Sequence, residues 1–213
     1  MSDPHANQPV LHYGASIERA RLVAIMVHGR GGSPEDLLGL AEALNVPDVA
    51  YVAPSAAGRS WYPLSFLAPI ERNEPGLSSA LGVLSRLVDG FSQQGVPHER
   101  LVIIGFSQGA CLSVEFAARN ARRYAAVIGL SGGLIGPPGT PRTYAGTLDG
   151  TPVFLGCSDV DPHIPLERVH ESADVFRRLG ASVDERIYPQ MGHTVGDDEI
   201  DAVRALLNSN RSQ

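Results

Sequence analysis

The sequence predicts an α/β protein in which helices cover both faces of a mostly parallel sheet. Short continuous runs of Val, Ile and Leu recur along the chain, as in strands that are buried on both faces. Segments with a helical spacing of apolar residues lie between these runs, which is typical of parallel strands joined by crossover helices. With 213 residues, of which 43% are hydrophobic and 19% charged, the chain suits one domain around a single core.

Six runs are candidate strands. Five of them are continuous and apolar, and they cover 21–29, 49–54, 100–106, 124–132 and 151–156. The sixth, 183–189, is more polar, which favours a place near an edge of the sheet. His12 lies in a further early segment that could form a strand of a hairpin.

Helical periodicity fills the intervals between the runs. Ser33 to Asp36 predict a helix start, with an N-cap serine, a proline at the first helical position and acids in the first turn. Apolar stripes occur in the segments 37–44, 77–91, 110–118, 166–176 and 200–207. Two stretches, 57–76 and 133–150, have no regular pattern. Long loops of this kind are often functional, so we expect these two to border a site.

Composition and the chain ends exclude several classes of protein. A net charge of −6 without a basic run argues against nucleic-acid binding, and no segment approaches the length of an apolar membrane span. The start, "MSDPHANQPV", has no signal-peptide pattern. We therefore expect a flexible tail over 1–9, a single domain over 10–213 and a cytoplasmic location. Cys111 and Cys157 lack any paired spacing, which argues against disulfides and zinc.

Two segments match the Gly-x-Ser-x-Gly pattern of a nucleophile elbow, "GFSQGA" at 105–110 and "GLSGG" at 129–133. In such an elbow the serine lies on a strained turn between a strand and a helix that opens immediately after it. The residues after Ser107 carry the apolar stripe of a core-facing helix. Those after Ser131 are rich in Gly and Pro and cannot form one. The sequence therefore predicts Ser107 as a nucleophile.

A serine nucleophile needs a general base, and histidine is the usual one. His193 lies in a glycine-flanked loop after the last candidate strand, at the end of the sheet where this architecture collects its chemistry. We expect His193 to be the base. Four other histidines are expected to be solvent-facing or structural: His5, His12, His98 and His170.

A carboxylate must orient that base, and it should come from the loop after 151–156. Asp159 and Asp161 both qualify. We favour Asp161, because two prolines that follow it pin a loop that would aim it away from the strand end, and Asp159 would support that loop. His163 is too close to Asp161 in sequence to be the preferred base, although a place on the rim of the site stays open.

The remaining requirement is a pair of N–H groups that hold an oxyanion. "VHGRGG" ends the first apolar run where the first helix begins, so the expected donors are the N–H groups of Arg30 and Gln108. His28 would hold this turn. The proline at the end of "GRGGSP" and the absence of Gly-Lys-Ser/Thr exclude dinucleotide and P-loop sites.

Five segments in this order, "HGRGG", "GFSQGA", "LSGG", "DVDPHIP" and "MGHTV", resemble the phospholipase/carboxylesterase family of α/β-hydrolases, which includes the acyl-protein thioesterases. The resemblance runs from about residue 20 to residue 207. It implies an α/β-hydrolase fold without a large lid and without a cofactor or metal. The site residues that it implies are Ser107 as nucleophile, Asp161 as acid, His193 as base, and Arg30 and Gln108 at the oxyanion positions.

The resemblance implies hydrolysis of carboxylic esters through an acyl-enzyme. We expect a small-molecule ester with a short to medium acyl chain as substrate, no nucleic acid, no stable membrane association, and a monomer or homodimer. Two alternatives stay open: a thioesterase or lysophospholipase with the same residues, and a non-catalytic scaffold that binds a ligand. Many eukaryotic members have an apolar residue at the position of Arg30, and the charge of Arg30 could favour anionic or polar substrates. Trp61 and Tyr62 either line a pocket or pack in a surface loop.

Overall fold

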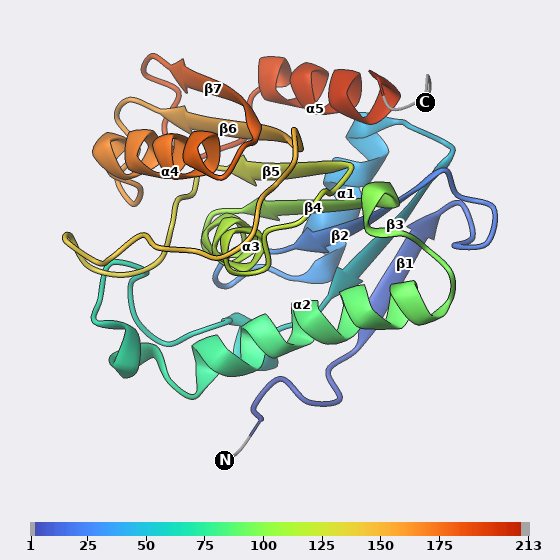
Figure 1. Ribbon diagram of the computed structural model, residues 1–213, viewed down its shortest axis with the longest axis horizontal. Helices are drawn as coiled ribbons and strands as arrows, with labels where there is room; N and C mark the ends of the chain where they lie inside the picture. The colour runs from blue at the N-terminus through green and yellow to red at the C-terminus, as the bar shows by residue number, and fades with distance from the viewer. Residues whose placement is uncertain (1–2, 210–213) are drawn as a thin grey trace.

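In the computed structural model, which describes residues 3–209, seven strands form one sheet (Figure 1). They are β1 (Val10–Gly14), β2 (Leu22–Val27), β3 (Val49–Pro54), β4 (Leu101–Phe106), β5 (Ala126–Leu130), β6 (Pro152–Ser158) and β7 (Ser182–Tyr188). Their order is β1-β3-β2-β4-β5-β6-β7, and every neighbouring pair is parallel except β1 with β3. The prediction of a mostly parallel sheet is confirmed. Residues 1–2 of the expected tail and 210–213 of the expected domain lie outside the described residues.

The six candidate strands correspond to β2 through β7. The more polar one, β7, lies at an edge of the sheet as predicted. The early strand that holds His12 is present as β1, but the hairpin is wrong. β1 pairs with β3 and not with β2, the next strand in the chain. The physical reason is that β2 already has parallel neighbours on both sides, and β1, which is half exposed, suits the free edge of β3.

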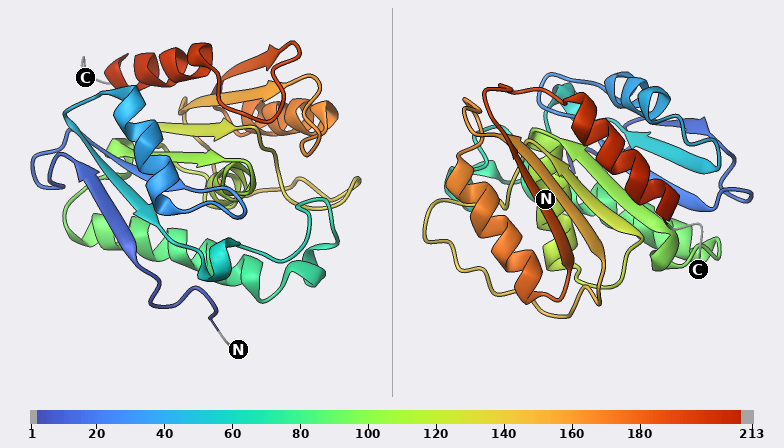
Figure 2. Two further views of the ribbon diagram at one scale, coloured as in Figure 1. Left: turned by 180° about the vertical axis from the view of Figure 1, so that it is seen from behind. Right: turned by 90° about the horizontal axis from the view of Figure 1, so that it is seen from above.

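Five helices flank the sheet within the described chain: α1 (Pro34–Leu44), α2 (Gly76–Gln93), α3 (Gln108–Arg119), α4 (Leu166–Arg178) and α5 (Asp197–Ser209). Helices α2, α3 and α4 pack on one face, and α1 with α5 pack on the other (Figure 2). The predicted coverage of both faces is therefore confirmed. None of the helices in residues 3–209 is both long and apolar enough to cross a membrane.

Strand β2 shows why the apolar runs are continuous. Val23, Ile25 and Val27 belong to the core under α2, α3 and α4, whereas Ala24 and Met26 belong to the core under α1 and α5. Successive side chains of a strand point to opposite faces, so a sheet that is covered twice needs an apolar residue at every position. Because β2 to β7 are parallel, their carboxyl ends lie at one edge of the sheet, where the loops that follow them can form a common site.

The two stretches without a regular pattern remain mostly loops. Residues 57–76 contain two short 3-10 turns, 57–59 and 70–73, and 133–150 contain no helix and no strand of the sheet. In the N-terminal segment, which the sequence predicts to be a tail, His5 is buried, with only 4% of its surface exposed.

Candidate active site

Ser107 lies on a sharp turn between β4 and α3. Its backbone has a φ of 56° and a ψ of −119°, a conformation that is strained for a residue with a side chain. The glycines on either side explain how the turn fits. A Cβ atom at Gly105 would lie 2.2 Å from the carbonyl oxygen of Gly109, and one at Gly109 would lie 2.0 Å from the carbonyl oxygen of Val27. Both positions therefore require glycine.

The second Gly-x-Ser-x-Gly match has a different surrounding. Ser131 follows β5, also with a positive φ, of 52°, but no helix opens after it. Its side chain is fully buried, and its N–H donates to the carbonyl oxygen of Gly156. Ser131 is thus a buried turn residue, and only Ser107 occupies a strand-to-helix elbow.

Three residues from three loops form one hydrogen-bonded chain. The Oγ of Ser107 lies 2.8 Å from Nε2 of His193, and Nδ1 of His193 lies 2.7 Å from Oδ2 of Asp161. A carboxylate can only accept, so Nδ1 carries the proton and Nε2 is free to accept the serine hydroxyl hydrogen. This geometry allows the imidazole to withdraw the serine proton during a nucleophilic attack.

Asp161 is held as an anion although its side chain is fully buried. Burial by itself would raise the pKa of Asp161, but hydrogen bonds outweigh it and the pKa is lowered. These bonds come from His193 and from the N–H groups of His163 and Ile164, which lie 2.8 Å and 3.0 Å from Oδ1. The thiol of Cys157 lies 3.8 Å from Oδ2. Burial raises the pKa of Cys157 to about 12, so the thiol stays neutral beside the carboxylate.

Two side chains at the end of β6 hold the loop that carries His193. Asp159 accepts a hydrogen bond of 2.8 Å from the N–H of Gln190, and the Oγ of Ser158 accepts one of 3.1 Å from the N–H of Gly192. Asp159 therefore contacts the loop main chain, while Asp161 contacts His193. The structure assigns the two neighbouring aspartates to different tasks.

The two expected oxyanion donors come from two segments, the loop after β2 for Arg30 and the start of α3 for Gln108. Gln108 is the first residue of α3, so its N–H has no acceptor within the helix. Among residues 3–209 no hydrogen bond engages the N–H of Arg30. The side chain of Gln108 is buried and spans a gap, because Oε1 accepts the N–H of Trp61 at 2.9 Å and Nε2 donates to the carbonyl oxygen of Tyr62 at 2.8 Å.

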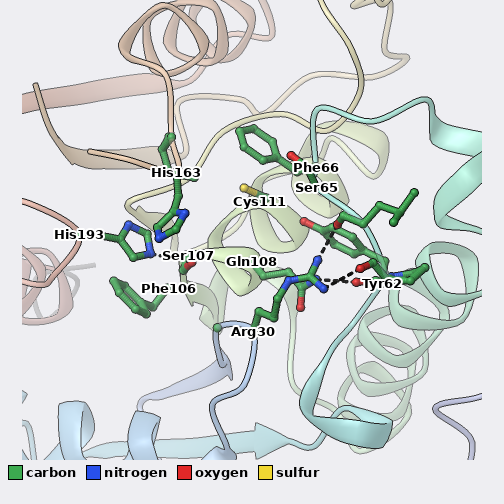
Figure 3. A pocket seen from close by; sticks show the side chains of 14 residues that line it. Arg30, Tyr62, Ser65, Phe66, Phe106, Ser107, Gln108, Cys111, His163 and His193 are labelled. Carbon is green, nitrogen blue, oxygen red and sulfur yellow. Dashed lines mark hydrogen bonds between the residues drawn. The ribbon is translucent and has the colours of Figure 1, made fainter. Parts of the chain in front are cut away.

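A cavity of about 710 Å³ opens beside Ser107. Arg30 and Tyr62 lie on one side of Ser107, and His163 with His193 lies on the other (Figure 3). The ring of His163 meets the ring of His193 edge-on, with 4.8 Å between centroids. His163 therefore lies at the wall of the cavity beside His193, and within the described residues it makes no hydrogen bond to Ser107. None of the lining residues, all within the described chain, is an Asp or Glu.

Trp61 is not among the residues that line the cavity, which favours the second of its two alternatives, packing within the loop. Its side chain is fully buried, and its indole N–H donates to the carbonyl oxygen of His28 at 2.9 Å. Tyr62 does line the cavity. His28 holds the turn, since its Nδ1 bonds the carbonyl oxygen of Gly29 at 2.7 Å and its Nε2 accepts the N–H of Ala56 at 3.1 Å.

Arg30 lines the cavity, and its guanidinium also binds the loop 57–76 through three hydrogen bonds. Nη1 donates to the Oγ of Ser60 at 3.2 Å and to the carbonyl oxygen of Pro63 at 2.8 Å, and Nη2 donates to that of Leu64 at 2.5 Å. All three acceptors are neutral, so the positive charge is not cancelled by a carboxylate in these bonds. Arg30 thus fixes the loop that forms one wall of the cavity.

Sequence reasoning missed most of the apolar wall. Leu64 and Phe66 line the cavity from the loop 57–76, where no periodicity marks them. Cys111 lines it from α3, and its position four residues after Ser107 on a helix is a signal that could have found it. Ile164 closes the wall beside Asp161. Cys157 does not line the cavity.

Comparison with known proteins identifies relatives of this chain. The model of the Phospholipase/Carboxylesterase family matches residues 13–210. A crystal structure of a phospholipase/carboxylesterase from Dyadobacter fermentans has a TM-score of 0.91 at 40% identity, and the match covers 94% of this chain and 97% of that one. Acyl-protein thioesterase 1 of Yarrowia lipolytica is 27% identical over 87% of this chain and 90% of its own length. The same-named protein of Gibberella zeae is 31% identical over 64% of this chain and 60% of its own length.

Proposed function

The chain belongs to the phospholipase/carboxylesterase family of α/β-hydrolases and is a serine hydrolase, and from this membership we propose that it hydrolyses small carboxylic esters through Ser107, His193 and Asp161. The observation that carries the proposal is the unbroken hydrogen-bonded chain from Ser107 Oγ to Asp161 Oδ2, which begins at the wall of the cavity. The substrate carbonyl would bind in that cavity, within reach of Ser107.

In the first step Ser107 Oγ attacks the carbonyl carbon while His193 Nε2 takes the hydroxyl proton. The carbonyl oxygen becomes an oxyanion and accepts hydrogen bonds from the N–H groups of Arg30 and Gln108. Asp161 stabilises the imidazolium without taking its proton. The C–O bond to the alcohol then breaks, and His193 returns the proton to the leaving oxygen, which yields the acyl-enzyme.

In the second step water attacks the acyl carbon, with His193 accepting one of its protons. The bond to Ser107 Oγ breaks, His193 returns the proton to that oxygen, and a carboxylic acid leaves. The serine is regenerated, so no cofactor is consumed in the cycle. The N–H groups of α3 and of the loop after β2 serve both tetrahedral intermediates, because both place an oxyanion at the same point.

The cavity supports short to medium acyl chains. Its apolar wall consists of side chains from three segments, so an acyl chain can bury its methylenes there. Leu64 and Phe66 come from the loop 57–76, Cys111 comes from α3, and Ile164 comes from the loop after β6. Phe66 and Cys111 are themselves buried and limit the depth of that wall. Chain-length dependence of kcat/KM with 4-nitrophenyl acetate through decanoate measures this limit. A steady rise through the longest chain would contradict the proposal.

A thioesterase is the second candidate, and the names of the relatives from Yarrowia lipolytica and Gibberella zeae favour it. The same residues would cleave a thioester, because attack and oxyanion stabilisation are common to both reactions. An oxygen ester and a thioester with the same acyl group separate the two. The carboxylesterase proposal expects a higher kcat/KM for the oxygen ester relative to the uncatalysed hydrolysis of each.

The decisive test is labelling with a fluorophosphonate probe together with a Ser107→Ala variant. We expect the folded wild type to form an adduct at Ser107, and we expect the variant to lose both labelling and turnover of a short-chain aryl ester by about 10⁶-fold, as for removal of the serine in comparable enzymes. Ser131→Ala is the matched control and should retain labelling. Turnover by Ser107→Ala near the wild-type level would contradict the assignment of Ser107 as the nucleophile. No adduct in the folded wild type would favour a non-catalytic binding scaffold.

A further inference from the structure

Trp61 connects the two segments that carry the proposed oxyanion donors. Its indole N–H donates to the carbonyl oxygen of His28, two residues before Arg30, at 2.9 Å. Its main-chain N–H donates to Oε1 of Gln108, also at 2.9 Å. Its carbonyl oxygen lies 2.8 Å from Nε2 of His5, a residue of the N-terminal segment. Every polar group of Trp61 is therefore used, and the residue is fully buried.

The N-terminal segment, residues 3–9, is tied to α2 at its start. The N–H of His5 donates to the Oγ of Ser79 at 3.0 Å, and Ser79 Oγ bonds in turn to Asp3. Oδ2 of Asp3 also lies 3.1 Å from Nη1 of Arg86, about two turns after Ser79 along α2. These contacts fix the position of His5 next to Trp61, even though the sequence of this segment is that of a polar tail.

The hydrogen bonds of His5 require one tautomer. The N–H of Ala57 donates to Nδ1 of His5 at 3.0 Å, so the proton must be on Nε2, which then donates to the carbonyl oxygen of Trp61. His28 requires the other tautomer, because its Nε2 accepts the N–H of Ala56 and its Nδ1 donates to the carbonyl oxygen of Gly29. The ring centroids of His5 and His28 lie 5.4 Å and 5.0 Å from that of Trp61, so both rings pack against the indole.

We propose that His5 is a positioning residue for the oxyanion hole and acts through Trp61. Loss of the bond from His5 lets Trp61 shift, and both segments bonded to Trp61, at His28 and at Gln108, lose their common anchor. Oxyanion donors act only when they are aimed at the developing charge, so a small displacement costs rate more than it costs substrate binding. This inference rests on the proposed function, since it assumes the oxyanion roles of Arg30 and Gln108.

The test compares full-length His5→Ala, His5→Gln and Trp61→Phe with wild type, and His12→Ala is the control because His12 is an exposed histidine of the same end of the chain. We expect His5→Ala to lower kcat roughly 10- to 100-fold while KM changes less than about twofold, because a misplaced donor weakens transition-state binding selectively. His5→Gln should recover most of the rate, since an amide can donate to Trp61 and accept from Ala57. His12→Ala should match wild type.

A boronic acid inhibitor adds the readout that distinguishes positioning from folding. It forms a tetrahedral adduct on Ser107 whose oxygen occupies the oxyanion hole, so its affinity should fall by the same factor as kcat. Trp61→Phe, which removes only the indole donor to His28, should show the same joint loss. Titration of Ser107 with a fluorophosphonate to completion counts the folded sites, and all rates are expressed per site.

Three results would overturn the inference: kcat per site unchanged in His5→Ala, a loss that appears in KM alone, or boronate affinity equal to that of wild type. A fall in the number of sites with unchanged kcat per site would likewise mean that His5 only stabilises the fold. Failure of the proposed function looks different, because wild type itself would then neither label nor turn over ester, and the inference would fall with it.

Discussion

At the scale of single residues, the candidate site depends on contacts too close for any alternative residue. The absence of a side chain at Gly105 lets the start of α3 approach β4, and its absence at Gly109 lets the end of β2 approach α3. Asp161 differs from Asp159 only by its place in a loop, yet one carboxylate contacts His193 and the other contacts the main chain at Gln190. Function at this scale follows from where a side chain is aimed.

Arg30 supports a prediction about selectivity. Its charge lies at a cavity whose lining residues include no acid, and we expect it to favour an ester with a carboxylate on the acyl chain. Arg30→Met should lower the ratio of kcat/KM for 4-nitrophenyl hydrogen glutarate to that for 4-nitrophenyl pentanoate by roughly fivefold, the worth of an exposed charge pair of about 1 kcal/mol. Initial rates of 4-nitrophenol release at low ionic strength give kcat/KM for each ester and hence this ratio.

Only the ratio is informative in that experiment, because Arg30 also clamps the loop at Pro63 and Leu64 and its loss should slow both substrates. Arg30→Lys keeps the charge and should keep the preference. An unchanged ratio in Arg30→Met would show that the guanidinium serves the loop alone.

At the scale of elements, each side chain of the candidate site lies just beyond the carboxyl end of a strand. Arg30 follows β2, Ser107 follows β4, Asp161 follows β6 and His193 follows β7. A helix begins within a few residues after each of them, so the start of that helix fixes the end of the loop that carries the site residue. The start of α1 is an example: Oδ2 of Asp36 accepts the N–H of Ser33 at 2.7 Å, directly after the loop that holds Arg30.

Removing this cap should weaken α1. Asp36→Ala is expected to lower the free energy of unfolding by about 1 kcal/mol, the usual cost of losing an N-terminal capping side chain. Asp36→Asn retains an acceptor oxygen and should stay within a few tenths of a kcal/mol of wild type. Urea denaturation followed by circular dichroism measures both. Equal loss in the two variants would mean that the charge of Asp36, and not its hydrogen bond, matters at this helix terminus.

At the scale of the whole molecule, two buried groups make stability depend on pH in opposite directions. Burial raises the pKa of Glu199, in α5, to about 7, although the N–H of Gly196 donates to its Oε2. Its Oε1 has no hydrogen-bond partner among the described residues. Burial also lowers the pKa of His28 from 6.5. The folded protein therefore prefers a protonated Glu199 and a neutral His28.

The signs follow from proton linkage. Glu199 binds its proton more tightly in the folded state, so stability falls as pH rises from about 4.5 to about 7, by an amount of order 3 kcal/mol. His28 binds its proton less tightly in the folded state, so its contribution is complete above pH 6.5 and is lost as pH falls below that value. Below pH 6.5 the two effects therefore oppose each other, and the decline caused by Glu199 stands alone only above that value.

Thermal unfolding measured from pH 5 to pH 9 tests this expectation. Glu199→Gln cannot ionise, so its Tm should not decline above pH 6.5 as that of wild type does. Below pH 6.5 only the contribution of His28 is left in this variant, so its Tm should rise with pH more steeply than that of wild type. A decline of the same size in wild type and in Glu199→Gln would assign it to other groups.

The sequence by itself determined the fold class, because continuous apolar runs alternate with amphipathic segments and only a doubly covered parallel sheet satisfies both. It also separated Ser107 from Ser131, since the power to form a helix is a local property of the residues that follow. The chain order and the strand ends then pointed to Asp161 and His193, which the structure places in contact with each other and with Ser107.

Only the tertiary structure decided what depends on contacts between distant segments. The pairing of β1 with β3 and the burial of Trp61 and of His5 involve partners between roughly forty and seventy positions apart, and no periodicity in these segments encodes them. The cavity wall formed by Leu64, Phe66 and Ile164 is likewise absent from local pattern. Local propensity acts over a few residues, whereas a site is built where loops from separate strands converge, and their packing is fixed only when the whole chain is folded.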